Sequence, residues 1–305
     1  EQLLQDTTLD FIVYDYLAEI TMSIMARARA KSPSAGYATD FIDAVIKPYI
    51  KRISTHNTRL ISNAGGVNPE KCAEVISELV KDLQLNLNVS CITGDDLMSS
   101  AQEIKNMNCK EMFSDIKFPE LDKVASMNAY LGAFAISKAL DKGADIVVTG
   151  RCVDSAVTLG ACIHAFNWTK SDLDQLAGGS LAGHILECGA QATGGNFTDW
   201  ELSKDIHNIG YPIAEILNDG IFEISKLPNT GGLVNVGTVS EQMLYEIGDP
   251  KKYLLPDVIC DFSEVSITEI SQNKVRVSGA KGLHPSNTYK VCATYADGYR
   301  GGTIM

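Results

Sequence analysis

The chain has 305 residues, of which 45% are hydrophobic and 21% are charged, and this balance is typical of a globular protein with a large buried core. The 38 Asp and Glu residues outnumber the 26 Lys and Arg residues, so the formal net charge is -12. That charge argues against a broad surface for nucleic acid or for an anionic membrane. No run of 18 apolar residues occurs, and we therefore expect no membrane-spanning helix.

The eight cysteines are scattered along the chain without any CxxC pair. Several lie in apolar runs, where reduced thiols act as small hydrophobic groups. We therefore expect an intracellular protein of the cytoplasm, with the mitochondrial matrix as the alternative for a eukaryotic source. The chain starts at Glu1 and stops at residues 301–305 inside an apolar, Gly-rich stretch, which predicts a fragment of a longer protein.

The first half of the chain alternates between apolar runs and helical patterns. The expected strands are residues 11–14, 59–62, 87–91 and 145–148. The expected helices are residues 17–30, 38–53, 69–83, 123–142 and a segment that begins after Asp154, with a less regular stretch at 106–119. We expect Ile20, Ile24 and Met25 to form the apolar face of the first helix. Asn68 and Asp154 are predicted helix caps, as is Asp95 or Asp96 after the third strand.

The second half has a different pattern. A helix is expected at 173–189, followed by a Gly-rich loop at 192–200 that contains two aromatic residues. Residues 213–216 and 221–224 flank an Asn-Asp-Gly turn and predict a hairpin. Thr238 and Glu241 have capping-box spacing before a helix at 240–247. Further short strands are expected at 257–262, 265–270, 274–278 and 289–294.

These patterns predict an α/β fold with a mostly parallel sheet and flanking helices, followed by a smaller, mixed, strand-rich domain. We assign residues 1–165 to the α/β domain, 166–205 to a connection of helix and Gly-rich loop, and 206–305 to a mixed α+β region truncated at its C-terminus. In a parallel sheet, ligands bind outside the carboxyl ends of the strands. Three Gly-containing loops follow predicted strands at 59–71, 87–100 and 144–160, and they indicate where a site would lie.

The loop at 149–156 contains Gly150, Arg151 and Asp154. A guanidinium next to a helix N-terminus can bind a carboxylate or a phosphate together with free backbone N–H groups. The alternative is that Arg151 pairs with Asp154 on its own helix. Under the first interpretation, replacing Arg151 by Ala abolishes ligand binding while the fold survives.

The loop at 62–69 offers Asn63, Gly65, Gly66 and Asn68, and the loop after the third strand offers Gly94. Glycines let a ligand approach the backbone, and an amide side chain supplies both a donor and an acceptor. A turn that needs positive φ before a helix explains the same residues. The loop matches neither the dinucleotide-binding nor the Walker fingerprint.

Carboxylates follow two of the expected strands, at Asp15, Glu19, Asp95 and Asp96. If they converge, they would bind Mg²⁺ or supply a general acid and base, whereas helix capping explains most of them structurally. His164, His184 and His207 are candidate proton carriers, and Glu187 lies three residues after His184. We take Asp15, Asp95, Asp154 and His184 as the candidate catalytic residues.

Gly194, Gly195 and Asn196 open the Gly-rich loop, and Phe197 and Trp200 follow them. Mobile glycines with apolar rings would suit a lid over a branched acyl chain. An interdomain linker whose aromatic rings pack onto the sheet is the alternative.

Four separated blocks occur in order along the chain: YDYLAEITM at 14–22, SNAGGVNP at 62–69, TGRCVDSA at 149–156 and YEIGDP at 245–250. Together they resemble the acyclic terpene utilisation A family across nearly the whole chain. Members of that family extend upstream with a strand and a Gly-rich loop, and the resemblance implies that both are missing here. It carries no established catalytic residues over to this chain.

The resemblance implies a role in the breakdown of acyclic terpenes, by way of branched acyl-CoA intermediates. The first hypothesis is thus an enzyme that acts on an acyl-CoA or a branched carboxylic acid by hydration, C–C cleavage or acyl transfer. The second is a non-catalytic acyl-CoA-binding or accessory subunit of a catabolic complex, and a homo-oligomer is a further expectation. A third is a scaffold in which the Gly-rich turns only shape the fold. Carboxylates and a histidine in one pocket would favour the enzyme.

Overall fold

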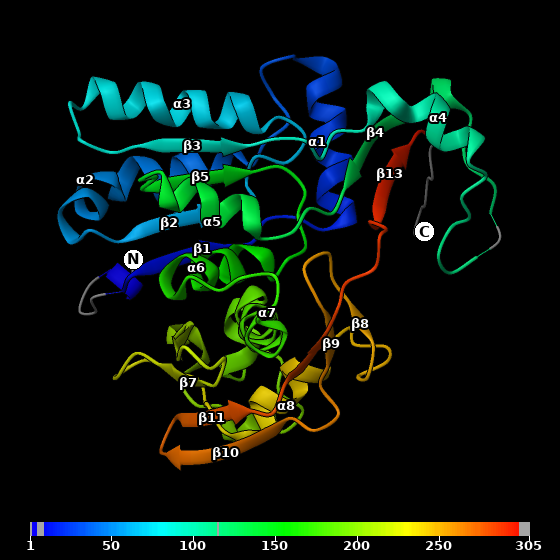
Figure 1. Cartoon of the computed structure of the whole chain (residues 1–305). Helices are drawn as coiled ribbons and strands as arrows, with labels where there is room; N and C mark the ends of the chain where they lie inside the picture. Colours follow the sequence, from blue (N-terminus) through cyan, green and yellow to red (C-terminus); the bar gives the residue numbers. More distant parts are fainter. Residues whose placement is uncertain (1, 5–8, 115, 299–305) are drawn as a thin grey trace, which may run out of the picture.

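A four-stranded parallel sheet forms the upper half of the molecule (Figure 1). The computed structural model describes residues 2–4, 9–114 and 116–298, so the predicted truncated end at 301–305 lies outside the described residues. The sheet has the order β1-β2-β5-β3, and its strands are β1 (Phe11–Tyr14), β2 (Arg59–Ser62), β3 (Val89–Ile92) and β5 (Ile146–Thr149). All four were predicted to within two residues, because each is a short apolar run that ends at a polar or Gly-containing loop.

Helices cover both faces of this sheet (Figure 1). Leu60, Ile146 and Val148 pack with one set of helices, and Ile61 and Val147 pack with the other, as the alternation of side chains along a strand requires. The first set is α2 (Lys47–His56), which a π-helical segment at Phe41–Ile46 precedes, and α3 (Pro69–Asp82). The second set is α5 (Phe134–Asp141) and α6 (Ala156–Phe166).

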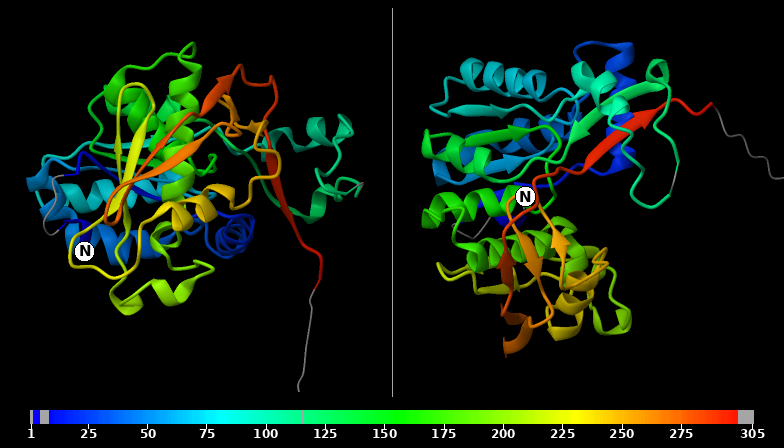
Figure 2. Two further views of the ribbon diagram at one scale, coloured as in Figure 1. Left: turned by 90° about the horizontal axis from the view of Figure 1, so that it is seen from below. Right: turned by 45° about the vertical axis from the view of Figure 1, so that its right-hand side comes forward.

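The lower half is built from antiparallel sheets on the far side of α7 (Leu173–Glu187) (Figures 1 and 2). One sheet has the order β10-β11-β7-β6, and the other has the order β12-β9-β8. Their strands are β6 (Pro212–Ile216), β7 (Phe222–Lys226), β8 (Tyr253–Leu254), β9 (Ile259–Asp261), β10 (Ser266–Ser271), β11 (Lys274–Ser278) and β12 (Lys281–Leu283). The expected hairpin is present as β6 and β7. The fold is therefore mixed α/β, with a parallel sheet and several antiparallel ones.

One hydrophobic core joins the two halves. It runs from Ile61 and Val147 of the parallel sheet, through Leu181 and Ile185 of α7, to Val275 of β11. Helix α7 is buried over most of its length, so it packs on both sides rather than presenting one apolar face. It thereby fixes residues near its C-terminal end against the edge of the parallel sheet.

The expected helix at 123–142 is wrong in its first part. Residues Val124–Ala129 form β4, which pairs antiparallel with β13 (Val291–Tyr295), and only Phe134–Asp141 is helical. Ala, Met and Leu favour a helix here, but the partner strand lies far along the sequence, and tertiary pairing overrides the local propensity. The C-terminal strand β13 thus returns to the first half of the chain (Figure 1).

The helix α1 (Glu19–Lys31) forms where it was predicted, but its apolar face differs. Ile20 and Ile24 are exposed at 69% and 60%, whereas Met22, Met25 and Ala26 are buried. The remaining helices are α4 (Ala101–Asn106) and α8 (Val236–Leu244). Short 3₁₀ turns occur at Gln2–Leu4, Met98–Ser100, Leu121–Lys123, Gly189–Thr193, Trp200–Leu202 and Ile206–Asn208.

Three predicted helix caps are wrong in detail. Asn68 precedes α3, but its amide donates to the carbonyls of Pro33 and Ala35 instead of capping the helix. Ser155, not Asp154, occupies the cap position of α6, because the Asp154 carboxylate pairs with Arg151. Helix α8 begins earlier than expected, and its capping box joins Asn235 to Thr238.

Asp95 and Asp96 also do not cap a helix as expected. The Asp96 carboxylate accepts the Met98 N–H, within a turn that leads into a 3₁₀ segment. Asp95 turns inward, toward the neighbouring strand end.

Candidate functional site

The carboxyl ends of the parallel strands bring several predicted residues to one edge of the sheet. Asp15 follows β1, Asn63 follows β2, Arg151 and Asp154 follow β5, and Asp95 follows β3. The sheet order therefore places them in a row, with Asp15 at one end and Asp95 at the other. The sequence predicted this edge correctly as the place where polar groups gather.

Three carboxylates meet at this edge: Asp15, Asp154 and Glu187. One oxygen of each lies within 4.8 Å of the others. Asp15 and Asp154 come from the sheet, whereas Glu187 is the last residue of α7. Asp15 and Asp154 were expected here, but Glu187 was noted only for its spacing from His184. The signal that sequence reasoning missed is the position of Glu187 at the end of a helix without a polar face.

Asp15 and Asp154 are held by hydrogen-bond donors, and Glu187 lies beside a histidine. Asp15 Oδ1 accepts from the Asn63 amide and from the Leu17 backbone N–H, the latter at 3.1 Å. Asp154 Oδ1 lies 2.7 Å from Arg151 Nη1. Glu187 Oε1 lies 3.0 Å from His184 Nδ1 as an ion-pair contact. The side chains are therefore oriented by the surrounding structure.

Burial and mutual repulsion perturb these groups. Burial, helped by the Asp154 charge, raises the pKa of Asp15 to about 6. Burial raises the pKa of Glu187 to about 7, and it raises the pKa of Asp154 against the opposing effect of Arg151. Burial lowers the pKa of His184, but the nearby Glu187 outweighs this effect and the net pKa is raised. Perturbed groups of this kind concentrate at functional sites.

Arg151 adopts the second of its two expected arrangements. Its side chain is only 2% exposed, its Nη1 donates to Asp154 and to the Leu17 carbonyl, and its guanidinium lies 4.0 Å from the centre of the Tyr130 ring. Burial lowers the pKa of Arg151, but Asp154 and Tyr130 outweigh this effect, so the group stays charged. Arg151 thus holds Asp154, one member of the carboxylate cluster, in place. Binding of an external anion by Arg151 stays a prediction.

Asp95 and Gly150 form a packed support on the β3 side. Asp95 Oδ2 accepts from the Arg151 backbone N–H and from the Asn128 amide, both at 2.8 Å. Gly150 leaves the room that Asp95 needs, because a Cβ at this position would lie 2.5 Å from both carboxylate oxygens. Burial raises the pKa of Asp95. These contacts give both residues a structural role, and a catalytic role for Asp95 stays a prediction.

The loop after β2 divides into two parts. Asn63 faces the site, since its amide donates to Asp15 and its oxygen accepts from the Tyr16 N–H at 2.7 Å. Gly65 and Gly66 are packed instead: a Cβ on Gly65 would lie 2.5 Å from the Thr149 carbonyl oxygen, and Gly66 has a φ of 55° beside Met25. Asn68 also bonds the segment at 33–35. The glycines and the Asn68 amide of this loop therefore contact other parts of the protein.

The Gly-rich loop contacts the lower half of the molecule rather than the carboxylates. Gly194 lies beside Ser203, Gly195 lies beside Ala190, and Phe197 packs against Gly237. Trp200 is 63% exposed. Asn196 is also exposed, and Gly94 has a φ of 110° with open space around it. A lid function for residues 194–200 stays a prediction.

The other acids and histidines lie elsewhere. Glu19 accepts from Tyr130 and Lys290, and Asp96 lies 3.7 Å from Arg29, so neither joins Asp15. His164 pairs with Asp141, and the exposed His207 pairs with Asp205. The carboxylates that converge are thus a different set from the one the sequence suggested.

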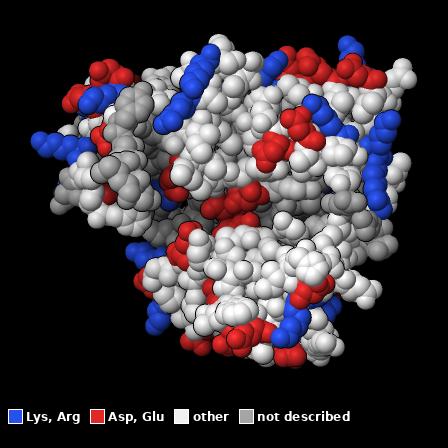
Figure 3. All heavy atoms as spheres, turned by 180° about the vertical axis from the view of Figure 1, so that it is seen from behind, with Lys and Arg blue, Asp and Glu red and all other residues white. Residues whose placement is uncertain are grey.

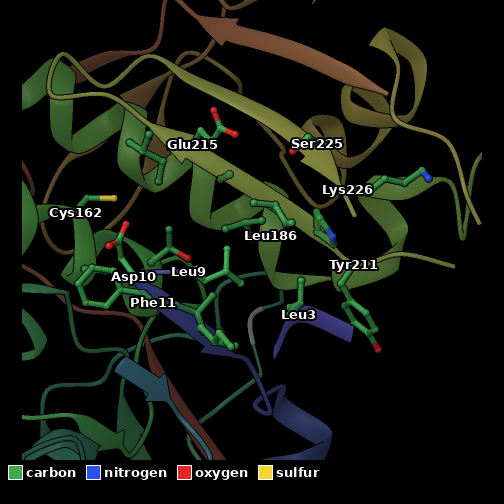
Figure 4. A pocket seen from close by; sticks show the side chains of 18 of the residues that line it. Leu3, Leu9, Asp10, Phe11, Cys162, Leu186, Tyr211, Glu215, Ser225 and Lys226 are labelled. Atoms are coloured by element: carbon green, nitrogen blue, oxygen red, sulfur yellow. The ribbon is translucent and has the colours of Figure 1, made fainter. Parts of the chain in front are cut away.

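Two cavities lie beside the parallel sheet. The smaller, of about 110 Å³, is lined by residues that include Asn68, Gly94 and Asp95, and its size suits water or an ion rather than an organic ligand. The larger, of about 830 Å³, lies between β1 and β6 and is mostly apolar; Figure 4 shows Phe11, Leu186 and Cys162 around it. None of the predicted site residues lines the larger cavity.

The walls of the larger cavity include two strand edges. All residues from Asp10 to Val13 and from Pro212 to Ile216 line it in unbroken succession, and β1 and β6 are the edge strands of their sheets. Side chains of one strand alternate between faces, so an unbroken run of lining residues means that the backbone edge also faces the cavity. A ligand in this cavity must therefore form hydrogen bonds with backbone N–H and C=O groups and also contact apolar side chains.

Charged side chains on the surface are distributed unevenly. Figure 3 shows acidic side chains in the hollow that crosses the middle of one face, while Lys and Arg are spread around its rim. All eight cysteines are free thiols. Among the described residues, no helix combines the length and the apolar character needed to cross a membrane.

The fold and the site define an α/β protein with a buried ionisable cluster at the carboxyl edge of its parallel sheet. The model of the family "Acyclic terpene utilisation family protein AtuA" matches residues 1–305, and the chain belongs to this family. The family name indicates involvement in the utilisation of acyclic terpenes. No curated protein and no solved structure matches the chain.

Proposed function

We propose that the protein is an enzyme of acyclic-terpene or branched-chain breakdown that acts on a branched acyl-CoA or branched carboxylic acid. The site of the reaction is the edge of the parallel sheet where Asp15, Asp154 and Glu187 meet. The family supports the metabolic setting. The observation that carries the proposal is the convergence of these three carboxylates with His184.

This convergence favours an enzyme over an accessory subunit that only binds acyl-CoA. A binding module needs shape and a few hydrogen bonds, and partly buried carboxylates within 4.8 Å of one another would only destabilise it. Carboxylates and an imidazole in one place are the groups that transfer protons or polarise a carbonyl. Hydration, C–C cleavage and acyl transfer remain the candidate reactions, because negative charge develops on a carbonyl oxygen in each.

The larger cavity supports a CoA ester over the free acid. Val13 and Leu186 line this cavity, and they precede Asp15 and Glu187 in the sequence by two residues and by one residue. The pantetheine arm of CoA is extended and carries two amide groups. It would pair with the exposed strand edges of β1 and β6, whereas a hydrocarbon chain alone would leave them without partners.

The test is a thermal-shift series followed by product analysis on the whole protein. A short branched acyl-CoA, free CoA and the matching free acid are compared, and a ligand at about 100 times its dissociation constant adds about 2.7 kcal/mol of stability. We expect the acyl-CoA to stabilise most, and mass spectrometry to detect its conversion. Glu187→Gln should abolish conversion, while Asp96→Asn, at an exposed carboxylate outside the cluster, should leave it unchanged.

Two results would count against the proposal. Stabilisation by acyl-CoA without conversion would favour the accessory subunit. Conversion that survives in Glu187→Gln would move the reaction away from the cluster.

A further inference from the structure

The three carboxylates are spaced as ligands of one cation. Their oxygens lie within 4.8 Å of one another. In an octahedral Mg²⁺ site, oxygens on opposite sides of the ion are about 4.2 Å apart and neighbouring ones about 3.0 Å, so the three side chains would draw together around one ion. They also come from three separate segments, at the ends of β1 and α7 and in the loop after β5.

Among the described residues, the hydrogen-bond and ion-pair contacts of each carboxylate involve one of its two oxygens. Asn63 and Leu17 hold Asp15 Oδ1, Arg151 holds Asp154 Oδ1, and His184 lies beside Glu187 Oε1. In the part of the chain that the structure describes, Asp15 Oδ2, Asp154 Oδ2 and Glu187 Oε2 have no protein donor. Metal-binding carboxylates are commonly oriented in this way by donors outside the coordination sphere.

His184 supplies a second observation that points to a ligand. Its side chain is 1% exposed, and its ring nitrogens make no hydrogen bond of good geometry among the described residues, although Nδ1 lies 3.0 Å from Glu187 Oε1 and the Met243 backbone also acts on the ring. A buried imidazole without a well-formed hydrogen bond is unfavourable. A cation at the cluster, together with the water that it retains, would provide the missing partner on the side of Glu187.

The charges of the site point the same way. The three carboxylates are partly buried, and among the described residues Arg151 is the cation that hydrogen-bonds one of them, Asp154. With all three ionised and His184 neutral, two negative charges are left without compensation, which is unfavourable away from bulk water. One divalent ion balances them.

We propose that Asp15, Asp154 and Glu187 bind a divalent cation that prefers oxygen ligands, Mg²⁺ or Mn²⁺, with His184 orienting Glu187. The donor set contains no thiolate, and its three carboxylates suit hard cations better than zinc. The inference rests on the proposed function for its catalytic purpose, which is to polarise the substrate carbonyl. Its test uses the cation alone.

The experiment titrates chelator-treated protein with Mn²⁺, followed by calorimetry and by electron paramagnetic resonance, with Mg²⁺ as competitor. We expect one Mn²⁺ per chain and its displacement by Mg²⁺. Asp15→Asn and Glu187→Gln should each weaken Mn²⁺ binding at least tenfold. Asp96→Asn removes an exposed carboxylate outside the cluster and should bind as the wild type does. Circular dichroism checks that every variant is folded.

Absence of Mn²⁺ binding by the wild type would overturn the inference, as would equal affinity in all three variants. Either result could accompany normal conversion of acyl-CoA, and the cluster would then work without a metal. Conversely, Mn²⁺ binding at the cluster without any conversion would support the inference while the proposed function fails.

Discussion

The loops after β2 and β5 have similar sequences, since each places glycines and polar side chains between a buried strand and a helix. Their polar atoms have different partners. In the β2 loop, the Asn68 amide bonds two backbone carbonyls, and Gly65 is packed against the neighbouring strand end. In the β5 loop, Arg151 and Asp154 bond each other beside two further carboxylates.

The difference shows how to separate a structural loop from a functional one. Polar groups whose hydrogen bonds are all taken up by nearby backbone hold the loop in place. Charged groups that face other charged groups store electrostatic free energy that a ligand can release. Asn63 lies in the β2 loop and reaches the carboxylate cluster, because its amide donates to Asp15.

The largest effect is expected from Arg151→Met, which removes the guanidinium of the β5 loop. Asp154 then loses its buried partner, and breaking a buried ion pair from one side costs about 4 kcal/mol. The sequence alone suggested that the fold would survive loss of Arg151 with only ligand binding affected. Denaturant unfolding measures the change in the free energy of unfolding.

Arg276→Met is the matched control for Arg151→Met. It removes a guanidinium that pairs with Glu223 on the surface, where the Arg side chain is 51% exposed. Exposed pairs contribute little, so the control should remain close to the wild type. If the two variants are equally stable, the buried Arg151–Asp154 pair contributes no more to the free energy of unfolding than an exposed pair does.

Gly65→Ala tests the β2 loop and should have the next largest effect. The added Cβ would lie 2.5 Å from the Thr149 carbonyl oxygen and 2.7 Å from Cα of Pro69, and backbone atoms cannot move aside easily. We expect a loss of about 3 kcal/mol in the free energy of unfolding, with Mn²⁺ affinity unchanged in the folded protein. Gly248→Ala, at a glycine with open space around it, is the control. A stable Gly65→Ala protein that no longer binds acyl-CoA would make this loop a ligand cradle.

Local signals made the parallel sheet predictable. Strands β1 and β2 were predicted at their observed bounds. The signals that define them, an apolar run, a polar loop and a helix start, all lie close together in the sequence. Strand β4 was missed because its partner β13 lies more than 160 residues away. The exposed Ile20 and Ile24 were assigned to the core for the same reason: which face of α1 is covered depends on distant elements.

The site was predictable only in part. Asp15, Arg151 and Asp154 follow strands, so the general rule for parallel sheets identified them. The positions of Glu187 and His184 depend on where α7 packs. The sequence of α7 does not predict which of its faces meets the sheet, because the helix is apolar on all sides. The partners of Asn68 and Asp95 are likewise long-range, and from sequence these residues could not be distinguished from ligand-binding ones.

The smallest effect is expected from Trp200→Ala in the Gly-rich loop. The indole is 63% exposed, whereas the neighbouring Phe197 is buried against α8, so only Phe197 contributes to the packing of this loop. Trp200→Ala should change the free energy of unfolding by less than about 0.5 kcal/mol, while Phe197→Ala should cost about 3 kcal/mol.

Acyl-CoA affinity is the more informative measurement for Trp200→Ala, since a residue with no role in folding can still act as a lid. Affinity that falls at least tenfold in Trp200→Ala, with stability unchanged, would show that the exposed ring closes over the ligand and would place this loop in the same functional class as the β5 loop. Unchanged affinity would indicate that residues 194–200 have a structural role, as Gly65 and Asn68 have in the β2 loop.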